Sequence, residues 1–271
     1  MIINATRTVI VNRLPGGSLL VQCSLLSTFE EASVWVSVDP SNLEVASAAM
    51  EVYRSNREKP RWVDLPQLKG LKAYFDSGPQ LKNALVTNPI ARELVGECIK
   101  GIIQAEPWVC EERGWASQQA YLDDWAISNA NYCHNFTYPE EEDWSVPPRQ
   151  YNLFNRSEVT TLNMNNDRIL ASSIFIDTWH EMYMELKCSM DGVVVSATTS
   201  MIRLPHPGCR NGDGRINNLL GWHLTSNKRD IAALIGGPEG CVHLVDMVYA
   251  AGQLIDEARE AGLIVRAGTP S

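Results

Sequence analysis

The sequence lacks the short patterns that most often reveal a function. Its seven cysteines include no Cys-x-x-Cys pair, which excludes a zinc finger of the common paired type. The glycine-rich signatures GxGxxG, GxxxxGKS/T and GxSxG, typical of dinucleotide sites, phosphate loops and serine hydrolases, do not occur. Short motifs therefore identify no reaction for this chain.

Basic patches, long apolar runs and a targeting signal are also missing. Lys and Arg number 23 against 32 Asp and Glu, a net charge of −9, so the surface repels phosphate backbones and nucleic-acid binding is disfavoured. No apolar run is long enough to span a membrane. The first residues lack a basic start followed by an apolar core. We expect a cytoplasmic protein that binds a small-molecule substrate, with neither nucleic acid nor membrane as a partner.

What the chain does contain is two halves with the same order of elements. Residues 6–50 alternate apolar and polar side chains in blocks separated by turn residues, which predicts four short strands. Residues 155–207 have the same cadence, and helical spacing of apolar residues follows each strand block. Aligning the halves sets residues 29–31 against residues 179–181. We therefore expect a tandem duplication.

The duplication defines the expected domains. Residues 1–130 form a degenerate N-terminal lobe, residues 131–150 form a linker, and residues 151–271 form a C-terminal lobe that carries the site. The linker is acidic, contains prolines and shows no periodicity. Because strands precede helices in both halves, we expect an α+β fold of two similar lobes, each an antiparallel sheet followed by packing helices.

Residues capable of chemistry gather in the second half, which holds four of the five histidines. His180 begins a predicted strand, Cys209 follows the last strand in a turn with proline and glycine, and Cys241 opens the last long helix. A helix N-terminus lowers the pKa of a thiol, so Cys241 is the best candidate for a thiolate. Thiolate and imidazole groups at three loci predict a zinc or iron site formed by His180, Cys209, Cys241 and His243.

Each of these residues also has an ordinary structural interpretation. A buried thiol explains Cys241, a hydrogen-bonded core histidine explains His180, and Cys209 can be a turn residue. His243 lies about 200° from Cys241 around a helix and need not share its face. Cys188 lies in an apolar strand, which predicts a core position away from any site.

Three segments of the second half together resemble the bacterial domain of unknown function 2889. They are H-E-M-Y-M-E-L, R-L-P-H-P-G-C and G-G-P-E-G-C-V-H-L. The resemblance covers residues 155–258 and is most specific over residues 237–244. It implies a cytosolic bacterial protein associated with the catabolism of aromatic or acyl compounds, and it implies no particular reaction.

The second half is more distantly similar to the iron–sulfur scaffold family of NifU and IscU. Cys209 would match the middle scaffold cysteine, and Cys241 with His243 would match the late pair. The first scaffold cysteine has no counterpart, and only Asp177 or His180 lies near its place. The similarity implies a NifU/IscU-like fold for each lobe and an iron–sulfur cluster as the alternative to a single zinc or iron.

Three classes of function remain open. The first is a metal- or thiolate-dependent hydrolase, lyase or isomerase that acts on a small catabolic intermediate. The family resemblance implies that an aromatic compound is among the candidates for this intermediate. Glu181 would be its general base, and Arg229 would hold a substrate carboxylate. The second is a scaffold-derived carrier of a metal or an iron–sulfur cluster, and the third is a non-catalytic binding protein. A homo-oligomer is compatible with all three.

Overall fold

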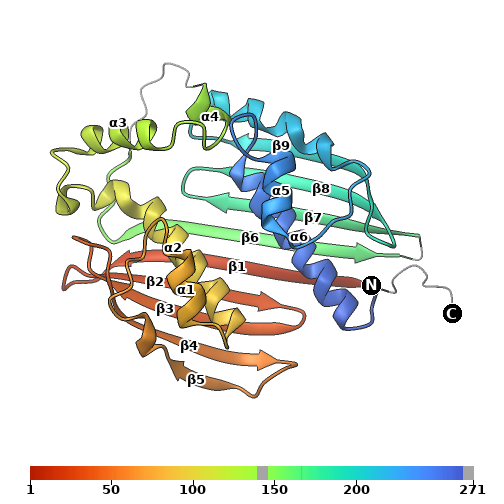
Figure 1. Ribbon diagram of the computed structural model, residues 1–271, viewed down its shortest axis with the longest axis horizontal. Helices are drawn as coiled ribbons and strands as arrows, with labels where there is room; N and C mark the ends of the chain where they lie inside the picture. The colour runs from red at the N-terminus through yellow and green to blue at the C-terminus, as the bar shows by residue number, and fades with distance from the viewer. Residues whose placement is uncertain (139–145, 166, 265–271) are drawn as a thin grey trace. The chain divides into compact units, whose positions relative to one another are not determined.

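The computed structural model describes residues 1–138, 146–165 and 167–264 (Figure 1). Two compact units can be distinguished. The N-terminal unit comprises Thr6–Trp125 and Ser145–Ser157, and the C-terminal unit comprises Met1–Ala5, Ala126–Trp144 and Glu158–Ser271. Both units combine antiparallel strands with helices, as expected for the α+β class. Residues 139–145 of the predicted linker lie outside the described residues, and residues 134–137 form the short helix α4 (His134–Thr137).

In the N-terminal unit the strands lie in the order β5-β4-β3-β2-β1. Their bounds are β1 (Ile2–Arg13), β2 (Leu19–Ser27), β3 (Glu30–Val38), β4 (Val45–Ser55) and β5 (Arg61–Asp64). Successive strands from β2 to β5 pair antiparallel. Alternate residues of β2, namely Leu19, Val21, Cys23 and Leu25, are buried, because successive side chains of a strand point to opposite faces. The period-2 pattern of residues 6–50 correctly predicted the four strands β1 to β4, whereas β5 was not predicted.

Helical segments follow the strands of this unit. They are η1 (Pro66–Leu68), α1 (Gly78–Ala84), α2 (Pro89–Ala105), η2 (Glu106–Trp108), η3 (Glu111–Arg113) and α3 (Gln118–Ser128). α2 packs on β2 and β3 (Figure 1). A Cβ at Gly101 would lie 2.6 Å from Val9 Cγ1, so only glycine lets the helix approach the strand this closely.

In the C-terminal unit the order of strands is β6-β7-β8-β9. They are β6 (Asn152–Met164), β7 (Arg168–Asp177), β8 (Glu181–Ser189) and β9 (Val194–Arg203). β7, β8 and β9 pair antiparallel. Met182, Met184 and Cys188 are buried on one face of β8. The predicted core position of Cys188 is therefore confirmed.

The helices of the C-terminal unit are, besides α4, η4 (Pro207–Leu219), α5 (Lys228–Ile235) and α6 (Val242–Glu260). α6 packs on β7 (Figure 1). A Cβ at Gly252 of α6 would lie 2.1 Å from the carbonyl oxygen of Thr225, so this helix also depends on a glycine for close packing. Among the described residues, no helix combines the length and apolar character needed to cross a membrane.

One hairpin turn is built in the same way in both units. Ser27 Oγ accepts hydrogen bonds from the backbone N–H groups two and three residues later, and Asp177 Oδ1 does the same. In each unit an arginine of the strand that follows the hairpin, Arg54 of β4 or Arg203 of β9, donates hydrogen bonds to backbone carbonyls of that turn. The pairing register of β3 with β4 shifts after Glu31 and again after Ser37. The register of β8 with β9 shifts after Glu181 and again after Lys187. The two hairpins therefore share local features that antiparallel pairing alone does not require.

The helices of the two units correspond as well. α1 and α5 begin after the N-cap residues Ser77 and Asn227. α2 begins after Asn88 and α6 begins after Cys241, and eight buried positions of the two helices coincide when counted from these N-caps. In each unit helices follow the strands, as the sequence predicted, although α4 precedes the strands of the C-terminal unit.

Candidate functional site

The site begins with the tight turn between β7 and β8. Asp177 Oδ1 accepts hydrogen bonds from the backbone N–H groups of Trp179 at 2.7 Å and His180 at 2.5 Å. An aspartate favours such a turn because its short carboxylate reaches the backbone two and three residues later. The turn sets the His180 ring beside the carboxylate, with Nδ1 at 3.0 Å from Oδ1 and 3.2 Å from Oδ2. Local sequence therefore creates an Asp–His pair.

Arg203, the last residue of β9, holds this turn in place. Its Nη2 donates to the carbonyl oxygens of Asp177 at 2.7 Å and His180 at 3.0 Å, and its Nη1 donates to that of Thr178 at 3.0 Å. The planar guanidinium can reach several acceptors at once because its N–H groups form a rigid fork. Arg203 thereby fixes the backbone that carries both members of the pair.

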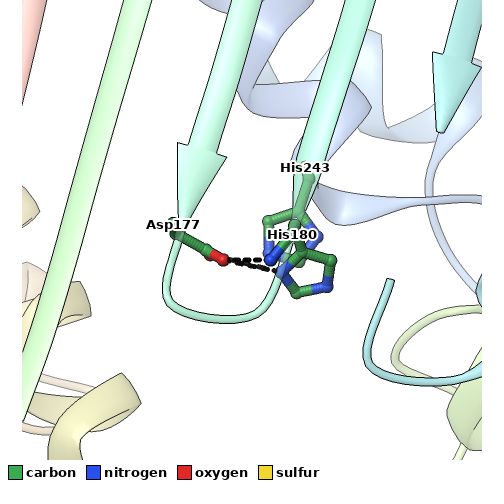
Figure 2. Close-up of side chains that lie close together, drawn as sticks. All are labelled: Asp177, His180 and His243. Carbon is green, nitrogen blue, oxygen red and sulfur yellow. Dashed lines mark hydrogen bonds and ion pairs between the residues drawn. The ribbon is translucent and has the colours of Figure 1, made fainter. Parts of the chain in front are cut away.

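His243 brings the first turn of α6 to the same place. Its ring centroid lies 4.0 Å from that of His180 and 5.2 Å from that of Phe175. Figure 2 shows the two imidazole rings next to each other with the Asp177 carboxylate directed at His180. One ligand atom from each of Asp177, His180 and His243 lies within 4.8 Å of the others. Asp177 and His180 are buried and His243 is half-buried.

The electrostatics keep the carboxylate ionised. Burial by itself raises the pKa of Asp177, but the hydrogen bond from the His180 ring and the charges of both rings favour the anion. The net result is that the pKa of Asp177 lies below its ordinary value. A buried carboxylate that stays charged beside two imidazoles is a suitable environment for a cation.

Of the two cysteines predicted as metal ligands, Cys241 lies beside this group, and neither belongs to the set of described ligand atoms within 4.8 Å of one another. Cys241 is the N-cap of α6, as expected, and its Sγ lies 3.9 Å from His243 Nδ1. Cys209 is half-buried in η4. Burial raises the pKa of Cys241 to about 12 and that of Cys209 to about 11, although backbone groups act in the opposite direction. The expected lowering of the Cys241 pKa is therefore wrong, because desolvation outweighs the helix N-terminus.

The two residues predicted to be catalytic, Glu181 and Arg229, are not members of the group formed by Asp177, His180 and His243. Glu181 immediately follows His180, and the buried Met182 follows Glu181, so the alternation of β8 directs Glu181 to the opposite face. Asp177 is thus the carboxylate that meets the histidines. Arg229 is exposed in the first turn of α5, where its backbone N–H donates to Asn227 Oδ1 at 3.2 Å.

Sequence reasoning missed two residues of this region. The sequence patterns give Asp177 only a place near that of a scaffold cysteine, although an aspartate three residues before a histidine in a strand-to-strand turn is a usable signal. Cys133 was assigned to the linker, where nothing in its neighbours along the chain points to a site. It is the N-cap of α4, which belongs to the C-terminal unit.

Comparison with known proteins adds a family match without a function. Residues 162–255 match the family model described as "Protein of unknown function (DUF2889)". The match includes Asp177, His180, His243 and Cys241. No curated protein and no solved structure matches the chain. The resemblance to this family is thereby supported for the second half.

Proposed function

We propose that the C-terminal unit is a metal-dependent enzyme module that binds one zinc or iron ion through Asp177, His180 and His243. The observation that carries the proposal is the approach of their ligand atoms to within 4.8 Å of one another in a buried setting. Two histidines and one carboxylate form a recurrent ligand set for non-haem iron, and zinc enzymes use closely related sets. The three groups come from two elements that are distant in sequence, β7–β8 and α6.

The spacing within the Asp177–His180 pair matches neighbouring ligands of one ion. Nitrogen and oxygen ligands lie about 2.0–2.2 Å from zinc, so two ligands of one ion are about 3.4 Å apart at the tetrahedral angle and about 3 Å apart at a right angle. His180 Nδ1 lies 3.0 and 3.2 Å from the two carboxylate oxygens. An ion can replace the proton that joins these groups without a change in the backbone, since metal binding requires neutral imidazole and ionised carboxylate.

Three protein ligands leave coordination positions for water or substrate. An ion held in this way polarises a carbonyl or activates a water molecule, which is the chemistry of hydrolases, lyases and some isomerases. A small catabolic intermediate with a carbonyl group fits that chemistry. This chain's own contribution is to orient the two imidazoles and to keep the Asp177 carboxylate charged in a buried position.

We also propose that the two halves arose by duplication and that the N-terminal half has lost the ligand set. The matching turns, arginine contacts and helix N-caps support this proposal. The positions of Asp177 and His180 correspond to Ser27 and Glu30, and the position of His243 corresponds to Ile90. Ile90 offers no ligand and Ser27 offers only a neutral hydroxyl, so Glu30 is the sole ionisable ligand among the three replacements. The NifU/IscU-like fold of each lobe stays a prediction.

Zinc binding to the metal-stripped full-length chain tests the proposal. Titration calorimetry should give one site, and His180→Ala, His243→Ala and Asp177→Asn should each weaken it by more than about 100-fold, since loss of an outer-shell partner already costs 10- to 100-fold. His223→Ala is the matched control, because His223 is an exposed histidine of the same unit. Zinc affinity that is unchanged in His180→Ala and His243→Ala would refute the assignment.

A further inference from the structure

The C-terminal unit brings together three cysteines from three separate segments. Cys133 is the N-cap of α4, Cys209 lies in η4, and Cys241 is the N-cap of α6. The neighbours of these cysteines are in direct contact. The His134 N–H donates to the carbonyl oxygen of Gly240 at 3.0 Å, so the residues that follow Cys133 and precede Cys241 are hydrogen-bonded.

A glycine brings η4 against the same segment. A Cβ at Gly212 would lie 3.1 Å from the carbonyl oxygen of Gly240 and 3.4 Å from Cys241 Cβ. Gly212 is three residues from Cys209, which is about one turn of a 3₁₀ helix. α4 and η4 also pack on each other. Cys133, Cys209 and Cys241 therefore border one small region.

These three cysteines differ from the others in their exposure. Cys133, Cys209 and Cys241 are half-buried, whereas Cys23, Cys98, Cys110 and Cys188 are buried. Partial exposure lets an ion reach these three thiols from solvent, whereas the other four are enclosed by the core.

We propose that Cys133, Cys209 and Cys241 form a second metal site, for a thiophilic ion such as Zn²⁺ or Cu⁺, next to the Asp177–His180–His243 group. Thiolates select such ions over the harder ones that prefer oxygen ligands. The three sulfur atoms are not all within 4.8 Å of one another in the described part of the chain, so binding includes rotation of the cysteine side chains. The thiols lose their protons to solvent as the sulfur–metal bonds form. This site does not depend on the first one.

Cadmium titration of the reduced, metal-stripped full-length chain tests this site. The wild type should develop a thiolate-to-cadmium charge-transfer absorption. Cys133→Ser and Cys209→Ser should each weaken this binding by more than the roughly 10- to 100-fold typical of an outer-shell change. Cys110→Ser, a substitution of a buried cysteine in the other unit, is the control and should leave the titration unchanged.

The His180→Ala variant separates this inference from the function proposed above. It should lose zinc from the histidine group and keep the cadmium absorption. Loss of the absorption in His180→Ala with retention in Cys133→Ser would overturn the inference, because Cys241 would then belong to the histidine group. Alkylation of the wild type gives a second readout that requires no variant to fold. Cadmium should protect Cys133, Cys209 and Cys241 together, and protection of Cys241 alone would equally overturn the inference.

Discussion

Arg203 offers a way to weaken the proposed metal site without changing a proposed ligand. Its guanidinium donates three hydrogen bonds to the turn that carries Asp177 and His180. In Arg203→Lys the charge remains, but a single ammonium replaces the planar fork and cannot bond the same three carbonyls in the same geometry. The turn should remain folded, since Asp177 Oδ1 still accepts its backbone N–H groups.

The expected magnitudes differ for stability and for metal binding. Arg203 is exposed, so loss of its contacts should lower the free energy of unfolding by only about 1 kcal/mol. Zinc affinity should fall about 10- to 100-fold, the usual cost of losing a group that orients metal ligands. Urea unfolding and zinc titration calorimetry measure the two quantities on the same protein.

Arg54→Lys is the matched control. Arg54 donates to the carbonyl oxygens of Ser27 and Thr28 in the corresponding turn of the N-terminal unit, where the histidine is replaced by Glu30. It should lower stability by a similar amount and leave zinc affinity unchanged. Zinc affinity that stays within about twofold of wild type in Arg203→Lys, or that falls equally in Arg54→Lys, would refute the reasoning.

Three further predictions concern the rest of the chain. Burial raises the pKa of Glu30 in the folded state above 4.5. The protonated carboxyl therefore contributes fully to the free energy of unfolding below pH 4.5, and this contribution is lost as the pH rises through the folded-state pKa. Glu30→Gln should therefore raise the unfolding free energy at pH 7 and flatten this acid-side dependence, as urea titrations across pH would show. Cys188→Ala should lower the thermal midpoint, with a cost of about 1 kcal/mol, but leave metal content unchanged; selective metal loss would contradict its core role. The triple variant Ser27→Asp, Glu30→His, Ile90→His should add a second zinc equivalent by elemental analysis, and a stoichiometry of one would count against the duplicated site.

Local sequence was sufficient for the two blocks of four strands and for the long helices that follow them, but not for β5 or α4. Alternation in β8 set Met182 and Met184 on the buried face, because the side-chain period of a strand is two. The start of α6 at Cys241 followed from the glycine-rich segment before an amphipathic run. The resemblance to the family also rested on short motifs, and the match of residues 162–255 to the family model supports it.

Tertiary structure alone decided which side chains meet. Nothing in the periodicity of β7 or α6 specifies that the His243 ring lies beside the His180 ring, since that contact depends on how the helix packs on the sheet. Cys133 lies near Cys241 only because the backbone N–H of His134 donates a hydrogen bond to Gly240, about a hundred residues further along the chain. The thiol of Cys241 shows the same limit. Its position at a helix N-terminus was visible in the sequence, but the burial that raises its pKa comes from residues that only the fold brings around it.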